Sequence, residues 1–97
     1  MGLIFHRLVQ NDLRAVLRYY EEEGGTPLAD RFFAELDGLV GQVASEPRKF
    51  HFVAQELRRA NMARFPYHLL FREGPTGVRV LVLRHHQRHP RFGTGRK

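Results

Sequence analysis

The sequence predicts an α+β fold, in which an N-terminal strand and a helical hairpin precede a three-stranded antiparallel meander. Two apolar stripes with helical spacing occupy residues 11–45 and are separated by two glycines. Three strand-like segments, the last two joined by a short glycine-flanked turn, follow in residues 56–85. We expect the helices to pack on one face of the sheet, within a single domain that spans residues 1–97.

The first predicted elements are a short strand and a helix. Residues 3–9 (LIFHRLV) are rich in large and β-branched apolar side chains without a helical period, which favours a strand. Asn11 or Asp12 can then cap a helix, since a short polar side chain accepts an unpaired backbone N–H. The apolar face of this helix consists of Leu13, Val16, Leu17 and Tyr20. Gly24 and Gly25 predict its end, because glycine adopts a left-handed backbone at little cost.

The second helix is predicted to begin at Thr26 and Pro27, because a hydroxyl can cap it and proline suits the first helical position. Its apolar stripe consists of Ala29, Phe32, Phe33, Leu36, Val40 and Val43. The Ser-Glu-Pro segment at 45–47 predicts the end of this helix, since a residue before proline avoids helical backbone angles.

Three strands are predicted at about 56–63, 66–73 and 78–85. The last two are joined by GPTG at 74–77, and so short a connection requires antiparallel pairing. In the last strand, three valines alternate with two leucines over residues 78–83. We therefore expect both faces of this strand to be covered.

Basic residues concentrate in the second part of the chain. Residues 1–56 contain 6 Lys and Arg against 9 Asp and Glu, for a net charge of −3. Residues 57–97 contain 10 Lys and Arg against a single acid, Glu73, for a net charge of +9. This asymmetry indicates an anionic partner, either nucleic acid or an acidic protein segment, although a solubilising surface has the same composition.

Composition also bears on compartment and cofactors. The chain has no cysteine, which excludes disulfides and thiolate zinc sites and is typical of a reducing cytosol. Its N-terminal apolar stretch is too short for a signal peptide, and no segment approaches the roughly 20 apolar residues of a membrane span. His86 and His89 lack neighbouring acids. We expect a soluble cytoplasmic protein without a metal or another cofactor.

Several motifs follow one another over nearly the whole chain: DLRAVLRYYEEEG, LADRFFAEL, LRR, RFPYHLLFRE, VLVLRHHQRHPRF and a terminal GR. In this order they resemble the ParE branch of the RelE/ParE superfamily of type II toxins. The most specific parts are Phe32 with Leu36, the segment 64–67 (RFPY), and His86, Arg88 and Pro90 after the last apolar strand. The resemblance implies the same fold that the elements predict.

The resemblance also implies a function. ParE toxins are associated with inhibition of DNA gyrase and with blocked replication, and each is neutralised by a cognate antitoxin that wraps around it. RelE relatives instead cleave messenger RNA in the ribosomal A site. We expect a ParE-like gyrase inhibitor that oligomerises, if at all, through its antitoxin. A ribosome-dependent mRNA endonuclease and a non-catalytic nucleic-acid-binding domain remain the alternatives.

Candidate catalytic residues follow from RelE relatives, in which arginines and a C-terminal tyrosine serve RNA cleavage. Matched by motif, these positions fall at His68, near His86 and near Phe92. Phenylalanine cannot exchange a proton, which favours a protein that is not an enzyme. His68 and His86 are catalytic candidates only for a nuclease, because histidine titrates near neutral pH. For His68, a half-buried strand residue is the stronger interpretation, and His85 points to the opposite face from His86.

Basic side chains are the candidates for target or antitoxin binding. Strands would hold several of them in one patch, and a basic C-terminal tail from about residue 87 adds others. The candidate binding residues are Arg58, Arg59, Arg64, Arg72, Arg84, Arg88 and Arg91. For the tail, a solvated and partly disordered segment is the alternative.

Overall fold

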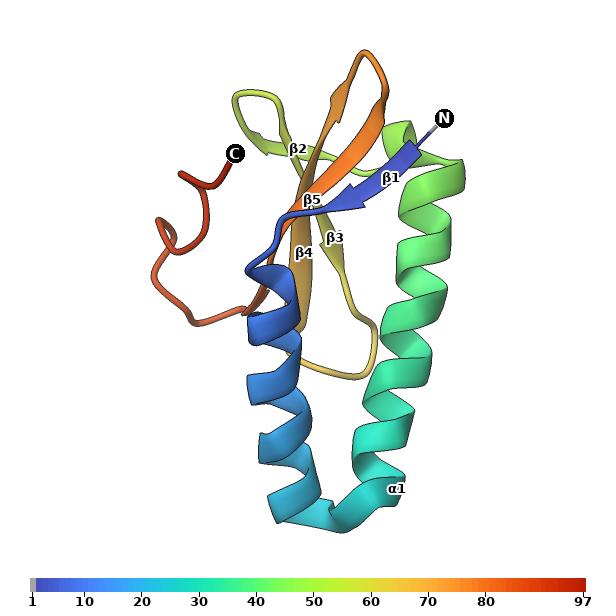
Figure 1. Ribbon diagram of the computed structural model, residues 1–97, viewed down its shortest axis with the longest axis vertical. Coiled ribbons are helices and arrows are strands. Elements are labelled where there is room, and N and C mark those ends of the chain that lie inside the picture. The colour runs from blue at the N-terminus through green and yellow to red at the C-terminus, as the bar shows by residue number, and fades with distance from the viewer. Residues whose placement is uncertain (1) are drawn as a thin grey trace.

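A helical hairpin and a five-stranded sheet make up the computed structural model, which describes residues 2–97 (Figure 1). Its elements are β1 (Gly2–Phe5), α1 (Val9–Ser45), the short 3-10 helix η1 (Pro47–Lys49), β2 (Phe52–Ala54), β3 (Leu57–Asn61), β4 (Tyr67–Gly74) and β5 (Gly77–His85). The strand order is β1-β5-β4-β3-β2. β1 runs parallel to β5, and the other pairs are antiparallel. The predicted fold class is confirmed.

Gly25 divides α1 into two antiparallel arms, residues 9–24 and 26–45 (Figure 1). Its φ of 76° and ψ of −179° lie outside the helical region. Only glycine adopts such angles without strain, so the predicted turn between two helices is correct. Pro27 lies in the first turn of the second arm, where its missing N–H is harmless.

The start of the first arm differs from the prediction. β1 ends at Phe5, and the helix begins at Val9 after a cap at Leu8 that has no side-chain hydrogen bond. The Nδ1 atom of His6 instead accepts the Leu8 N–H at 3.1 Å. Asp12, expected as a cap, lies in the first helical turn and bonds to residues far away in the sequence.

The core lies between the helical arms and one face of the sheet. Its buried members include Phe32, Leu36 and Val43 from the second arm, with Leu69 and Phe71 from β4. Leu39 completes the helical stripe in place of the predicted Phe33, which remains 49% exposed. The stripe therefore follows positions 32, 36, 39 and 43, and a side chain at 33 is rotated about 100° away from it.

Strand β2 was not predicted, so the antiparallel part of the sheet has four strands. All three of its residues are exposed, and a short edge strand without a buried face has no alternating pattern. Strand β5, in contrast, is buried on both faces as expected, with Val80 on the helical side and Val82 on the other, both 0% exposed. We call the sheet face away from the helices the outer face.

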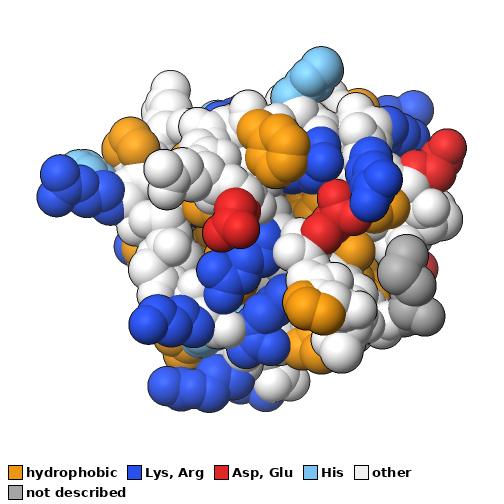
Figure 2. Space-filling model, turned by 90° about the horizontal axis from the view of Figure 1, so that it is seen from above, with side chains coloured by type: hydrophobic (Ala, Val, Ile, Leu, Met, Phe, Trp, Pro, Cys, Tyr) orange, Lys and Arg blue, Asp and Glu red, His pale blue; other side chains and the backbone are white. Residues whose placement is uncertain are grey.

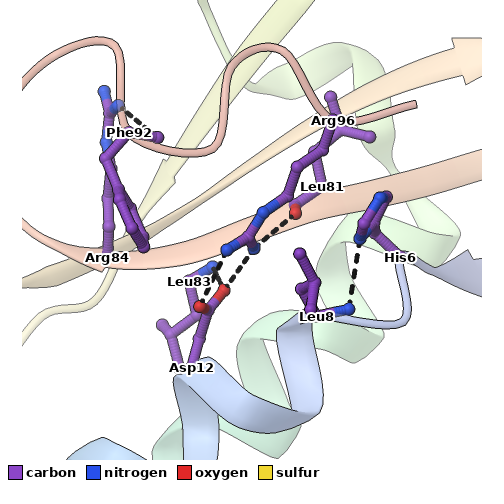
Figure 3. Close-up of polar contacts among 8 residues, drawn as sticks. All are labelled: His6, Leu8, Asp12, Leu81, Leu83, Arg84, Phe92 and Arg96. Carbon is purple, nitrogen blue, oxygen red and sulfur yellow. Dashed lines mark hydrogen bonds and ion pairs between the residues drawn. The ribbon is translucent and has the colours of Figure 1, made fainter.

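Residues 86–97, the C-terminal segment, return along the outer face toward the first arm of α1 (Figures 1 and 3). Gly93 has a φ of +79°, and a Cβ atom there would lie 2.5 Å from Cγ2 of Val82. The backbone thus packs directly on the strand, and only glycine fits. The C-terminal segment therefore contacts the sheet closely at Gly93.

Within residues 2–97, no helix is long and apolar enough to span a bilayer.

Candidate functional site

His68 and His86 meet on the outer face of the sheet. His68, in β4, lies opposite Arg84 of β5. His86 follows β5 directly, and its N–H donates to the Pro66 carbonyl at 2.8 Å. The Nδ1 atoms of the two imidazoles are 2.9 Å apart, and the rings stack with centroids 5.1 Å apart. The two catalytic candidates are therefore in direct contact.

The hydrogen bonds assign the proton on each ring. Nε of Arg84 always carries hydrogen and donates to Nε2 of His68 at 2.8 Å. The proton of neutral His68 must therefore sit on Nδ1, where it is donated to Nδ1 of His86. Nη2 of Arg59 approaches this same His86 atom at 3.2 Å. His86 consequently keeps its own proton on Nε2, and both imidazole lone pairs are occupied.

The surroundings hold both histidines neutral. Burial, followed by the positive charges of Arg59 and Arg84, lowers the pKa of His68 to about 3. Desolvation and then Arg59 lower the pKa of His86 as well. At neutral pH neither ring is an imidazolium that could donate a proton to a leaving group. The unprotonated nitrogen of each ring already accepts a hydrogen bond, so neither ring can act as a general base. The histidine pair is therefore suited to a structural role, in which it links β4 to the residue that follows β5.

Arg58 and Arg59 point to opposite faces of β3, because they are consecutive strand residues. Arg58 lies on the helical side, where it pairs with Glu73 at 3.3 Å and donates to the Phe50 carbonyl at 2.7 Å. Arg59 lies on the outer face and donates to Oδ1 of Asn61 at 2.7 Å. The predicted arginines of the strands therefore do not form one patch.

Arg64 and Arg72 also lie in different parts of the fold. Arg64 is exposed in the connection between β3 and β4, where its backbone N–H lies 3.3 Å from the Glu35 carboxylate. Arg72 is half-buried on the outer face, directly opposite Arg79 of β5.

Arg84 is a buried structural residue that binds the C-terminal segment to β5. It is 9% exposed, and Nη1 donates to the carbonyls of Pro90 at 2.7 Å and Phe92 at 3.0 Å. Arg88 and Arg91 are exposed, and the Arg88 guanidinium lies 4.0 Å from the centroid of the Phe92 ring. The C-terminal segment thus presents Arg88 and Arg91 while Arg84 anchors it.

A buried ion pair fixes the end of this segment and was missed from the sequence. Arg96 contacts Asp12 through two bonds, of 2.6 and 3.1 Å, and donates to the Leu81 carbonyl at 3.0 Å (Figure 3). The side chains of Arg96 and Asp12 are only 12% and 7% exposed. Because the partners are 84 positions apart, no local pattern signals the pair.

Two larger hollows flank the first arm of α1. One, of about 410 Å³, is apolar and lies between the two arms, with Leu13, Phe33 and Val40 among its lining. The other, of about 430 Å³, lies between the first arm, β5 and the C-terminal segment, and includes Asp12 and Arg88. Within residues 2–97, no three His, Cys, Asp or Glu side chains are grouped to hold a metal ion.

Known proteins resemble this chain in sequence and in fold. Residues 3–90 match the family described as ParE toxin of type II toxin-antitoxin system, parDE. A solved structure described as the chromosomal ParDE TA system from P. aeruginosa contains a chain with the same fold, at a TM-score of 0.79. The two are 18% identical, and the match covers 88% of this chain and 95% of that one. No curated protein matches this sequence.

Proposed function

The chain belongs to the ParE toxin family of type II toxin–antitoxin systems, and from this premise we propose that it inhibits DNA gyrase by binding, without catalysing a reaction. It is a toxin of the ParE kind. In the proposal, it acts in the cytoplasm, blocks replication there, and is silenced by a cognate antitoxin.

The state of the two histidines is the observation that carries the non-catalytic part of the proposal. His68 is neutral, buried and bonded through both ring nitrogens. An acid catalyst needs a labile proton at the working pH, and a base needs a free lone pair aimed at its substrate. Phe92, at the position of the relatives' tyrosine, has no exchangeable proton. Binding is the activity that this surface supports.

The C-terminal segment is the part of the surface that we assign to the target. Its exposed arginines, Arg88 and Arg91, are held in place by the Arg84 and Arg96 anchors. A positioned basic side chain loses less conformational freedom on binding than one on a disordered tail. Ordering of this segment therefore favours binding of the target through Arg88 and Arg91.

The antitoxin is proposed to approach the basic part of the chain. The end of the molecule that carries the β4–β5 turn displays several Lys and Arg side chains, with a few acidic ones among them (Figure 2). An acidic antitoxin segment would be attracted to such a surface over distances of about a Debye length.

A ribosome-dependent endonuclease is the alternative, because His68, His86 and Arg59 lie in direct contact on one face. If that alternative holds, His68→Ala and His86→Ala abolish cleavage of translated messenger RNA while the circular dichroism spectrum stays native. If the proposal holds, there is no cleavage to abolish.

Induction in cells without antitoxin tests the proposed function. Pulse labelling with thymidine and with methionine reports DNA and protein synthesis separately. The proposal predicts that thymidine incorporation falls first. Earlier loss of methionine incorporation would instead support the ribosomal target.

A further inference from the structure

Arg72 and Arg79 form a pair of like charges near the β4–β5 turn. They are directly opposite each other in the register of β4 and β5. Alternation along each strand places both on the outer face, because Phe71 and Val80 beside them belong to the core on the helical side. Like charges at directly opposed positions destabilise a sheet, so this placement needs a reason.

Among the residues that the structure describes, no acidic side chain forms an ion pair with either arginine. Glu73 is the only acidic residue among residues 57–97. Its carboxylate lies on the other side of the sheet, 3.3 Å from Arg58 and 3.5 Å from Arg48. Within residues 2–97, neither Arg72 nor Arg79 makes an ion pair or a side-chain hydrogen bond.

One donor of the pair is also buried without a partner. Nε of Arg79 is inaccessible to water and has no hydrogen-bond acceptor within residues 2–97. Leaving a charged donor in this state costs free energy, which an incoming acceptor would recover. Both arginines line a hollow of about 200 Å³.

The hollow has room for one side chain and a mixed lining. Besides the two arginines, it is lined by apolar Ile4 and Pro75 and by Thr76. A carboxylate on a short aliphatic stem matches this lining, because its oxygens reach two guanidinium groups while its methylenes contact apolar surface. Glu73 also contributes to the rim, but its carboxylate is paired with Arg58 and Arg48. A hollow of this size admits one side-chain carboxylate rather than the row of phosphates of a nucleic acid backbone.

We propose that Arg72 and Arg79 form a carboxylate-binding site that receives an Asp or Glu side chain of the antitoxin. The inference rests on the proposed function, in which an antitoxin binds this chain. It adds where one antitoxin side chain binds and which chemical group that side chain carries. It also gives the unneutralised arginine pair a role in the complex, where the bound carboxylate supplies the missing charge.

Binding of the purified product of the neighbouring reading frame, measured by surface plasmon resonance, tests the site. Arg72→Gln and Arg79→Gln each remove one guanidinium, and Arg31→Gln removes an equal charge from an exposed position of the second arm. We expect each site variant to weaken binding at least about tenfold, mainly through faster dissociation, because a desolvated charge pair is broken. Arg31→Gln should change the association rate alone, by less than about threefold.

Thermal unfolding of each free variant shows that the result concerns binding rather than folding. Because the substitution relieves a like-charge contact, Arg79→Gln should unfold at the same temperature as the wild type or above it. Equal dissociation rates for wild type, Arg72→Gln and Arg79→Gln would overturn the site while gyrase inhibition still supports the toxin function. A wild-type chain that does not bind this protein at all overturns the site together with the proposed partner. Loss of duplex DNA binding in the two site variants, with antitoxin binding unchanged, would also overturn it.

Discussion

Acidification should destabilise the protein through His68. In the folded protein the pKa of His68 is about 3, whereas the ordinary value is 6.5. Below pH 6.5 the His68 imidazole is therefore protonated in the unfolded chain but stays neutral in the folded protein. The free energy of unfolding consequently falls as the pH falls toward 3. The loss is about 1.4 kcal/mol for each pH unit in this window, or about 2 kcal/mol between neutral pH and pH 5.

Urea unfolding at several pH values between 8 and 5 measures this effect. His68→Gln keeps an acceptor for Arg84 but cannot titrate, so its stability should vary less with pH than that of the wild type, by about 2 kcal/mol over this range. His89→Gln is the matched control, because it makes the same substitution at an exposed histidine outside the His68–His86 pair. Parallel stability curves for wild type and His68→Gln would refute a depressed His68 pKa.

Three further outcomes are expected. Asp12→Asn should lower the free energy of unfolding by about 2–3 kcal/mol, because it leaves the Arg96 guanidinium without its carboxylate in a largely buried place; a change in Tm of only a degree or two would contradict this. Gly93→Ala should destabilise by more than about 1 kcal/mol, because its φ is +79° and the new Cβ would meet Val82. Gly95→Ala, which meets nothing within 4 Å, is its control in the same thermal melts. Stopped-flow association of toxin with antitoxin should slow as sodium chloride is raised, and a rate independent of salt would exclude electrostatic steering.

Local chemistry explains what the sequence predicts correctly. The glycine pair, the threonine and proline after it, and the proline at 47 act on the backbone of their own neighbours, so the two helical arms and their boundaries follow from them. The GPTG turn determines the β4–β5 hairpin in the same way. By contrast, β2 has no buried face, and therefore no pattern identifies it.

The site depends on contacts that sequence spacing does not encode. The His68–His86 contact requires the chain to turn at the end of β5 and pair with Pro66, and the Arg96–Asp12 pair joins the two ends of the chain. The sequence does predict that His85 and His86 diverge, because that follows from strand alternation. The sequence predicts a basic surface, but it does not show which arginines make contacts within the protein. Arg58 and Arg84 are recognised as structural only from their partners in the fold.

Supercoiling of relaxed plasmid by purified DNA gyrase, with the purified chain added, tests the central claim most directly. We predict that wild type and His68→Gln inhibit supercoiling to the same extent and that added antitoxin restores it. We also predict that ribosomes translating a messenger RNA in the presence of the chain leave that RNA intact. Uninhibited gyrase together with cleaved messenger RNA, with cleavage lost in His68→Gln, would contradict the central claim.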